Sequence, residues 1–222
     1  FYAVQKNINI QTGQPTILDF DMQRISQRIN IVFNIRTEGN IKREDLAAPI
    51  IELSGACGRF NIADACLDTT RLYRMAHQVQ PDEFTQTGEG TYRCVVHFHT
   101  LGVIPSAAKG HLNGPGILQV ALQVSTPQLD SSGAPVVDEE GNPVKNSRYI
   151  YGAINPYDEL TAAQLIEVRD GKIYLRYSKE DVNIEITTPL VIKADQIVPN
   201  DTGMGWQPHD PTNPDDDIII EI

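Results

Sequence analysis

Hydrophobic and polar residues alternate with a period of two along much of the chain, which predicts strands because successive strand side chains point to opposite faces. The clearest case runs from Ile25 to Arg36. One face of this segment carries Ile25, Ile29, Ile31, Phe33 and Ile35, and the other carries mostly polar side chains. We therefore expect a long, half-buried strand of an antiparallel sheet.

Four more segments alternate in the same way: Tyr92 to Phe98, Leu118 to Val124, Lys172 to Tyr177 and Val182 to Thr187. The last two predict a hairpin that turns at Ser178 to Asp181. We expect shorter strands at Val4 to Ile10, Thr16 to Phe20, Ile50 to Ser54, Arg148 to Ala153, Leu190 to Lys193 and Ile218 to Ile222.

Turn chemistry separates these strands, with Gly, Asn, Asp and Pro clustered at residues 37–40, 130–133, 138–143 and 170–171. Helical signals are few: a turn or two within Asp64 to Gln80, and a short helix at Thr161 to Val168 with Thr161 and Gln164 as a capping box. Many short strands with little helix predict an all-β fold, an antiparallel Greek-key β-sandwich.

The chain of 222 residues is long enough for one large sandwich, and we expect a single domain over residues 1–222. Residues 199–217 are rich in Pro, Asp, Asn and Gly and predict an extended irregular arm. The arm ends in Asp215 to Asp217 and leads into a C-terminal strand. Because the chain opens on Phe1 without a signal peptide, we expect that targeting information preceded it.

Composition excludes several classes of function. Eighteen Lys and Arg against 29 Asp and Glu give a net charge of −11, which disfavours nucleic acid and anionic membrane surfaces as partners. Cys57, Cys66 and Cys94 fit neither a disulfide scaffold nor a zinc site. We expect free thiols, and Cys57 with Cys66 is the pair we favour if a disulfide forms.

Few residues suggest chemistry. His97 and His99 share one face of a strand, but no third metal ligand is evident, so a solvated or hydrogen-bonded pair is the preferred interpretation. The acidic runs 138–140 and 215–217 lack the spacing of a calcium loop. Nucleophile and phosphate-binding motifs are absent. We therefore expect no enzyme activity, no catalytic residue, no metal and no cofactor.

Two features suggest contact with partners. Trp206 is either an exposed contact residue or a plug packed on the sandwich. The tail from Ile218 to Ile222 is either the last strand of this domain's own sheet or a strand added to the sheet of a neighbouring subunit. In the second case Ile218, Ile220 and Ile222 fill pockets on one side of the strand.

Several segments together resemble the Bacteroidales fimbrillin-like lipoproteins, the family of major and minor fimbrium subunits and related domains. They are Asp21 to Ile31, Ile51 to Gly55, Pro189 to Ile192, Gly203 to Trp206 and the acidic run into the Ile-rich tail. The resemblance covers most of the chain, best at its two ends. It supplies no catalytic residues.

The resemblance implies a transthyretin-like sandwich, export to the outer-membrane surface through a lipid anchor that is absent from this chain, and assembly by strand exchange. It also implies that the chain is mainly the C-terminal domain of a larger precursor. We therefore expect a structural or adhesive fimbrium subunit whose partners are other fimbrial subunits or host and bacterial surface ligands.

A glycan-binding module is the alternative, with Tyr149, Tyr151, Tyr157 and Trp206 as stacking residues. A virion structural protein with a similar sandwich stays open, since fold alone does not fix function.

Overall fold

The computed structural model describes residues 2–3, 12–13, 23–39, 41–176, 181–193 and 196–209, and these residues are almost entirely strands and turns. The elements follow one another as β1 Tyr2–Ala3, β2 Gln23–Arg24, β3 Gln27–Glu38, the 3-10 turn Arg43–Asp45, β4 Ile50–Asn61, β5 Cys66–Gln78, β6 Phe84–Gly88, β7 Thr91–Thr100, β8 Leu118–Pro127, β9 Lys145–Ile154, α1 Tyr157–Ala162, β10 Ile166–Arg169, β11 Lys172–Leu175, β12 Val182–Lys193, β13 Gln196–Ile197 and β14 Gln207–Pro208.

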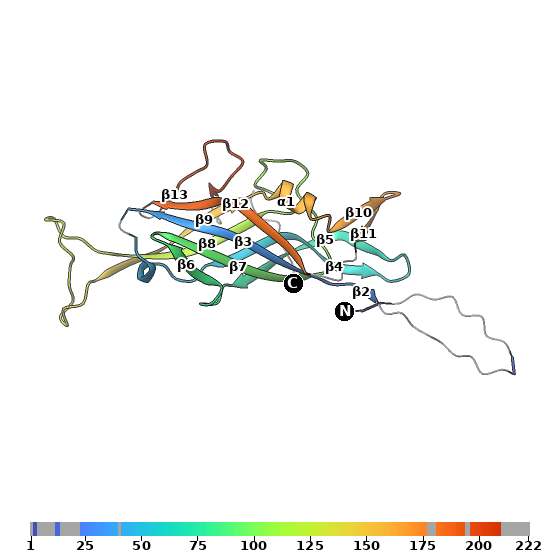
Figure 1. The fold of residues 1–222 in the computed structure, drawn as a ribbon, viewed down its shortest axis with the longest axis horizontal. Coiled ribbons are helices and arrows are strands. Elements are labelled where there is room, and N and C mark those ends of the chain that lie inside the picture. The colour runs from blue at the N-terminus through green and yellow to red at the C-terminus, as the bar shows by residue number, and fades with distance from the viewer. Residues whose placement is uncertain are drawn as a thin grey trace.

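Two sheets pack face to face along the length of the molecule (Figure 1). The seven-stranded sheet has the order β10-β11-β5-β4-β8-β9-β14, and the five-stranded sheet has the order β13-β12-β3-β7-β6. A separate pair joins β1 to β2. Antiparallel pairing dominates, so the predicted all-β sandwich is confirmed. One neighbouring pair, β12 with β3, is parallel.

The core lies between the two sheets and is built by the alternation seen in the sequence. Ile29, Ile31, Phe33 and Ile35 of β3 are fully buried. The inward residues of β7 and β8 are buried in the same core, while the residues between them are half-buried or exposed. The long strands were therefore predicted correctly in position and facing. The predicted strands at Ile50, Arg148 and Leu190 lie within β4, β9 and β12.

The predicted hairpin between residues 172–177 and 182–187 is wrong. β11 pairs with β10 through the tight turn Asp170–Gly171, where both residues have positive φ, and belongs to the seven-stranded sheet. β12 instead runs parallel to β3 in the other sheet, with Ile184 opposite Ile31. Alternation identified both strands. It does not specify which strand each one pairs with, because the buried face of either strand is apolar and fits more than one partner.

The two predicted helical segments also differ from the structure. Residues 66–78 form β5, because Leu67 and Met75 pack inward from a strand and several outward positions are exposed. The helix near Thr161 exists, but it is α1 and begins at Tyr157, with Pro156 at its N-cap. Thr161 lies near its end, and Gln164 follows in a positive-φ conformation, so the proposed capping box is wrong.

The β8–β9 hairpin projects well beyond the sandwich as a two-pronged tip at the left of Figure 1. At each prong an aspartate side chain accepts hydrogen bonds from backbone N–H groups that follow it. Asp130 accepts from Ser132 and Ala134, and Asp138 accepts from Glu140 and Asn142. Self-contained turns of this kind hold the tip without help from the core.

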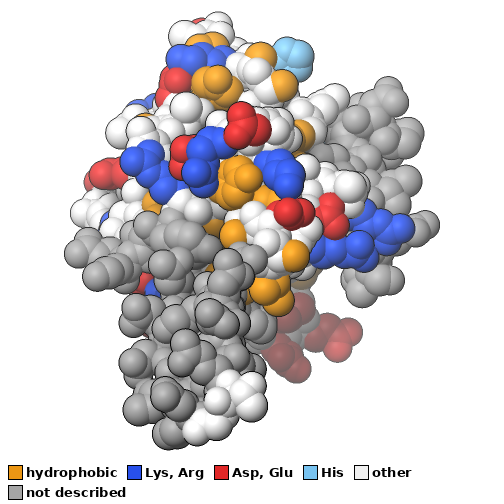
Figure 2. All heavy atoms as spheres, turned by 90° about the vertical axis from the view of Figure 1, so that its right-hand side faces the viewer, with side chains coloured by type: hydrophobic (Ala, Val, Ile, Leu, Met, Phe, Trp, Pro, Cys, Tyr) orange, Lys and Arg blue, Asp and Glu red, His pale blue; other side chains and the backbone are white. Residues whose placement is uncertain are grey.

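The opposite end of the molecule faces the viewer in Figure 2, where side chains of both charges surround hydrophobic ones. Ion pairs here join Arg59 to Asp68 and Lys172 to Asp64. Ile62, on the turn between β4 and β5, is 62% exposed, and Val168 of β10 is 65% exposed. Within the described residues, no helix is long and apolar enough to cross a membrane.

Residues 199–209, the described part of the expected irregular arm 199–217, form a loop and the short strand β14. Asn200 and Trp206 close a tight loop, in which the Asn200 N–H donates to the Trp206 carbonyl oxygen. β14 then pairs with the edge of β9. This segment is irregular but folds back onto the sandwich, because Trp206 anchors it. Residues 210–217 and the predicted strands at Val4 to Ile10, Thr16 to Phe20 and Ile218 to Ile222 lie outside the described residues.

Candidate functional site

β7 has a strand partner on its outer edge over only part of its length. β6 pairs with residues 91–94, and the Val95 N–H donates to the Glu83 carbonyl oxygen at 2.9 Å. Alternate residues of a strand direct their backbone groups to the same side, so the N–H and C=O groups of His97 and His99 point to this outer edge. Among the described residues, no strand pairs with that edge beyond Val95.

β5 has a comparable edge in the other sheet. On one side it pairs with β4 from Asn61 to Ile50, and on the other it meets β11 at a single register position, Leu67 with Ile173. Over residues 69–77 its outer edge has no strand neighbour within the described part of the chain. Among the described residues, each sheet therefore has a strand edge without a partner, and the two strands concerned, β5 and β7, lie next to each other.

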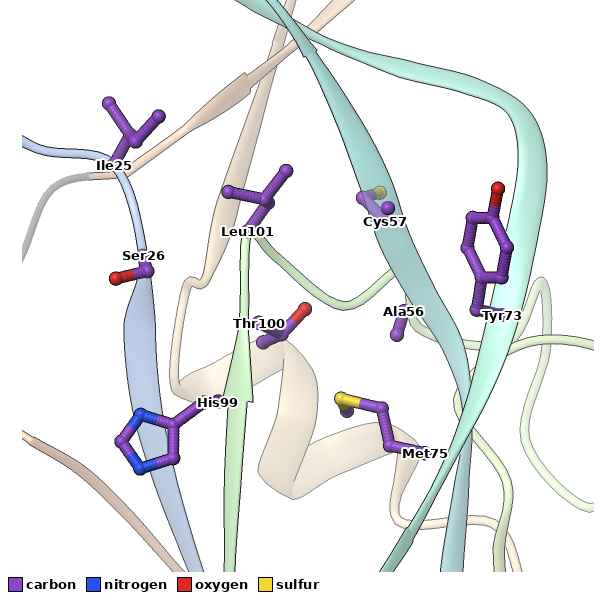
Figure 3. A pocket seen from close by; sticks show the side chains of 10 residues that line it. Ile25, Ser26, Ala56, Cys57, Tyr73, Met75, His99, Thr100 and Leu101 are labelled. Carbon is purple, nitrogen blue, oxygen red and sulfur yellow. The ribbon is translucent and has the colours of Figure 1, made fainter. Parts of the chain in front are cut away.

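An apolar groove lies between these two edges (Figure 3). Its volume is about 560 Å³. In the close-up, Thr100 and Leu101 of the β7 side stand opposite the β4 and β5 side chains, with Ile25 above them. We call this the lateral groove, and its lining is Ile25, Ser26, Ala56, Cys57, Gly58, Tyr73, Met75, His99, Thr100 and Leu101.

Next to the lateral groove, the chain after β7 crosses from one sheet to the other. Cys57 N–H donates to the Gly102 carbonyl oxygen, and Ile104 N–H donates to the Gly55 carbonyl oxygen. Gly55 has a φ of 84°, and a Cβ there would lie 2.6 Å from the Ile104 oxygen. A glycine is therefore needed for the crossing strand to approach β4 this closely.

Glycine also shapes the groove wall. A Cβ on Gly58 would lie 2.2 Å from the Tyr73 ring, so the ring packs directly over the bare β4 backbone. Cys57 beside it is only 3% exposed. Burial, with a smaller contribution from the nearby Asp68 carboxylate, raises the pKa of the Cys57 thiol to about 11. This thiol is neutral at physiological pH and acts as part of the apolar lining.

A cluster of His77, Glu83 and His97 lies close to the groove, since His77 and His97 are two residues along β5 and β7 from the lining residues Met75 and His99. His77 Nε2 lies 2.8 Å from Glu83 Oε2, and His97 Nε2 lies 3.6 Å from Glu83 Oε1. The two imidazole rings meet edge to face with centroids 6.3 Å apart. His77 belongs to β5 and His97 to β7, so a carboxylate on the β5–β6 connection ties the two sheets together.

The neighbours of this cluster shift its titration. Burial alone raises the pKa of Glu83, but hydrogen bonds from the Gln80 N–H and from His77, with the charges of both histidines, bring it below its usual value. Burial and then the Arg28 guanidinium lower the pKa of His97, against the opposing effect of Glu83. His97 Nδ1 also donates to Asn30 Oδ1 at 2.7 Å. The surroundings thus make protonation of both His97 and Glu83 less favourable than it is in water.

His97 and His99 both lie on β7, but their side chains have different surroundings. His97 belongs to the cluster, and His99 is exposed at the lateral groove. Sequence reasoning missed His77 and Glu83 as neighbours of His97, because they lie on another sheet and on a connection. Among the described residues, no group of three or more His, Cys, Asp or Glu side chains is arranged to hold a metal ion.

Trp206 is not an exposed contact residue. Its side chain is 1% exposed, its ring centroid lies 5.1 Å from that of Phe33, and its Nε1–H donates to the Thr188 carbonyl oxygen. The alternative interpretation, a plug packed on the sandwich, is confirmed. Ile218, Ile220 and Ile222, predicted as a subunit contact, lie outside the described residues.

The cysteines are free and buried, as the preferred interpretation predicted. Cys57 pairs across β4 and β5 with Leu72, and Cys66 pairs with Asn61. Cys57 and Cys66 thus occupy different positions of the β4–β5 ladder. The tyrosines proposed for stacking separate into two groups: Tyr149 and Tyr151 stack on β9, whereas Tyr157 begins α1.

Comparisons with protein-family models, with curated proteins and with solved structures found no match to this chain. The site must therefore be interpreted from its own geometry.

Proposed function

We propose that the chain is a non-enzymatic structural or adhesive subunit of an extracellular assembly, and that its lateral groove accepts an extended strand from a neighbouring subunit. One observation supports the proposal: within the described residues, two sheet edges without strand partners border one apolar groove. A strand placed there gains main-chain hydrogen bonds from the edge and buries alternate side chains in the groove, the mode known as strand addition.

The C-terminal tail has the properties that such a strand needs. Ile218, Ile220 and Ile222 alternate along the sequence, so they would share one face of the segment if it is extended, and Asp215 to Asp217 precede them. A strand of five residues spans roughly 17 Å. The outer edge from His97 to Leu101 also comprises five residues. An apolar groove suits three isoleucines, and acidic residues beside the tail limit uncontrolled edge pairing.

A fimbrium is the assembly that the resemblance to fimbrillin-like proteins suggests, with the subunit displayed at the outer-membrane surface. The projecting β8–β9 tip and the short turns at its end are suited to contacts with surface ligands. This assignment rests on the sequence resemblance, whereas the acceptor role rests on the groove.

The test compares oligomeric state by light scattering after size exclusion. We expect the intact chain to form concentration-dependent oligomers and the chain ending at Asp217 to be a folded monomer. His99→Pro removes the backbone N–H that points to the open edge and should abolish oligomers. His99→Ala keeps that N–H and should leave them unchanged.

Folding of every variant is checked by thermal melting. Folded monomers for the intact chain at all concentrations, or equal oligomers for His99→Pro and His99→Ala, would contradict strand addition at this edge. A truncated chain that no longer folds would instead place the tail in this domain's own sheet.

A further inference from the structure

The outer face of the seven-stranded sheet carries a second hollow, on the side away from the core. Register places Ala121 of β8 between Ile50 of β4 and Tyr151 of β9. The small Ala121 side chain leaves a depression with Tyr151 as one wall and Ile50 as another. Its volume is about 150 Å³. The hollow is independent of the lateral groove, which opens at the edge of the sandwich.

Polar groups border the same hollow. Arg74 Nη1 lies 3.1 Å from Glu52 Oε2, and Gln119 Nε2 lies 3.1 Å from His209 Nε2. The charges of Arg74 and Glu52 compensate each other. A carboxylate has a second oxygen and a primary amide has both donor and acceptor atoms, so Glu52 and Gln119 present more hydrogen-bonding capacity than these contacts use.

Two aromatic rings extend the surface along β9. Tyr149 and Tyr151 stack with centroids 6.2 Å apart and an interplanar angle of 24°. Tyr149 is 52% exposed, and Gln123 of β8 lies opposite it in the register. The face therefore combines aromatic planes with a border of amides and a neutralised ion pair. Few precisely placed polar groups around an apolar hollow are typical of small-molecule sites.

The chemistry selects a ligand that has both an apolar face and hydroxyl groups at its rim. A pyranose ring has this character: its C–H bonds pack on an aromatic ring, and its hydroxyls bond to amides and carboxylates. A strongly anionic ligand is disfavoured, because the local charges compensate and the whole chain carries −11. We propose that the hollow at Ala121 binds one neutral pyranose unit of a glycan, with Tyr151 as the stacking residue.

The experiment uses the intact protein and four neutral sugars as probes: glucose, galactose, mannose and N-acetylglucosamine. Glucuronic acid serves as the anionic comparison. Saturation-transfer NMR reports contact with sugar C–H protons, and amide shifts of the labelled protein locate the site. We expect at least one neutral sugar to shift the amides of Gln119, Ala121 and Tyr151, and glucuronic acid to bind more weakly.

Two variants remove the site in different ways. Tyr151→Ala removes the stacking ring, and Ala121→Leu fills the hollow from an outward-facing strand position; each should weaken binding about tenfold or more. The matched control is Tyr174→Ala on β11 of the same sheet. The Tyr174 ring packs under Arg169, and β5 and β4 separate β11 from β8, the strand that carries Ala121. Tyr174→Ala should leave binding unchanged.

Thermal melting confirms that each variant folds. The proposal is overturned if none of the four sugars shifts the named amides at ~100 mM, a concentration at which even millimolar affinity saturates a site. It is also overturned if Ala121→Leu and Tyr174→Ala bind equally well, since the sugar would then sit elsewhere. Tighter binding of glucuronic acid than of every neutral sugar would contradict the inferred ligand class.

Discussion

Among single residues, Trp206 attaches the segment after β13 to the core of the sandwich. Its ring fills the space beside Phe33, and its indole N–H satisfies the Thr188 carbonyl oxygen. The segment from 199 to 209 contains little other apolar material, so this one side chain supplies most of its attachment to the core.

Trp206→Ala should therefore destabilise the fold by about 3–5 kcal/mol, the usual cost of deleting a large buried aromatic side chain. Trp206→Phe keeps much of the packing and loses one hydrogen bond, which should cost about 1–2 kcal/mol. Urea denaturation of the three proteins measures both values. Equal stability of the alanine variant and the wild type would show that the ring is dispensable.

The cluster of His77, Glu83 and His97 predicts a pH dependence of stability. The folded state lowers the pKa of His97, so below about pH 6.5 the unfolded chain takes up a proton that the folded chain resists. Stability then falls as the pH falls. The lowered pKa of Glu83 acts in the same direction, but only as the pH drops below about 4.3.

We expect wild-type protein to be less stable at pH 5.5 than at pH 7.5, and His97→Gln to lose much of that difference. His111→Gln, on an exposed loop, is the control and should behave as wild type. Denaturant midpoints at the two pH values provide the measurement. If His97→Gln keeps the pH dependence of the wild type, groups other than His97 cause that dependence, which contradicts the prediction.

Little of this residue-scale detail was predictable from the sequence. The facing of Ile29, Ile31 and Phe33 followed from alternation alone, because burial on a strand is a local pattern. The contact of His97 with Glu83 and the packing of Phe33 against Trp206 depend on how separate segments meet. No periodicity within either segment encodes such a contact.

At the scale of elements, the chain holds its strands in place with glycines at close backbone crossings. Gly55 lies where β4, the segment after β7 and the loop before β8 converge. A Cβ at this position would lie 2.6 Å from the Ile104 oxygen and 2.7 Å from the Gly116 nitrogen. Gly133, at the tip of the β8–β9 hairpin, has a similar φ of 82° but nothing within 4 Å of a Cβ.

Comparison of the two glycines separates backbone strain from collision. Gly133→Ala should cost about 1–2 kcal/mol, the penalty of left-handed backbone for an L residue. Gly55→Ala adds collisions with two neighbouring segments, at Ile104 and at Pro115–Gly116, and should cost at least about 3 kcal/mol. Thermal or urea unfolding measures the difference. Equal costs would mean that the crossing relaxes without loss.

The sequence predicted which segments are strands better than how they pair. Alternation placed β3, β7 and β8, and the Asp170–Gly171 turn joins β10 to β11. The partner of β12 and the strand character of residues 66–78 were missed. Pairing between distant strands depends on which apolar faces meet in the folded chain, and a polar-looking edge strand such as β5 lacks a regular pattern.

At the scale of the whole molecule, the sandwich offers two distinct surfaces on one scaffold. The lateral groove opens between β5 and β7 at the edge, and the hollow at Ala121 lies on the outer face of the larger sheet. The proposed adhesive role requires both a contact with neighbouring subunits and a surface for a ligand. The two proposals can succeed or fail separately, because they use different residues.

Amide hydrogen exchange at the outer edge of β7 tests directly whether a strand binds in the lateral groove. The chain ending at Asp217 is measured alone and with a peptide of the sequence Asp216 to Ile222. His97 and His99 amides should exchange rapidly alone, because they point to the open edge, and slowly with the peptide, because a bound strand accepts their hydrogen bonds. Unchanged exchange of both amides at saturating peptide would contradict strand addition at the lateral groove.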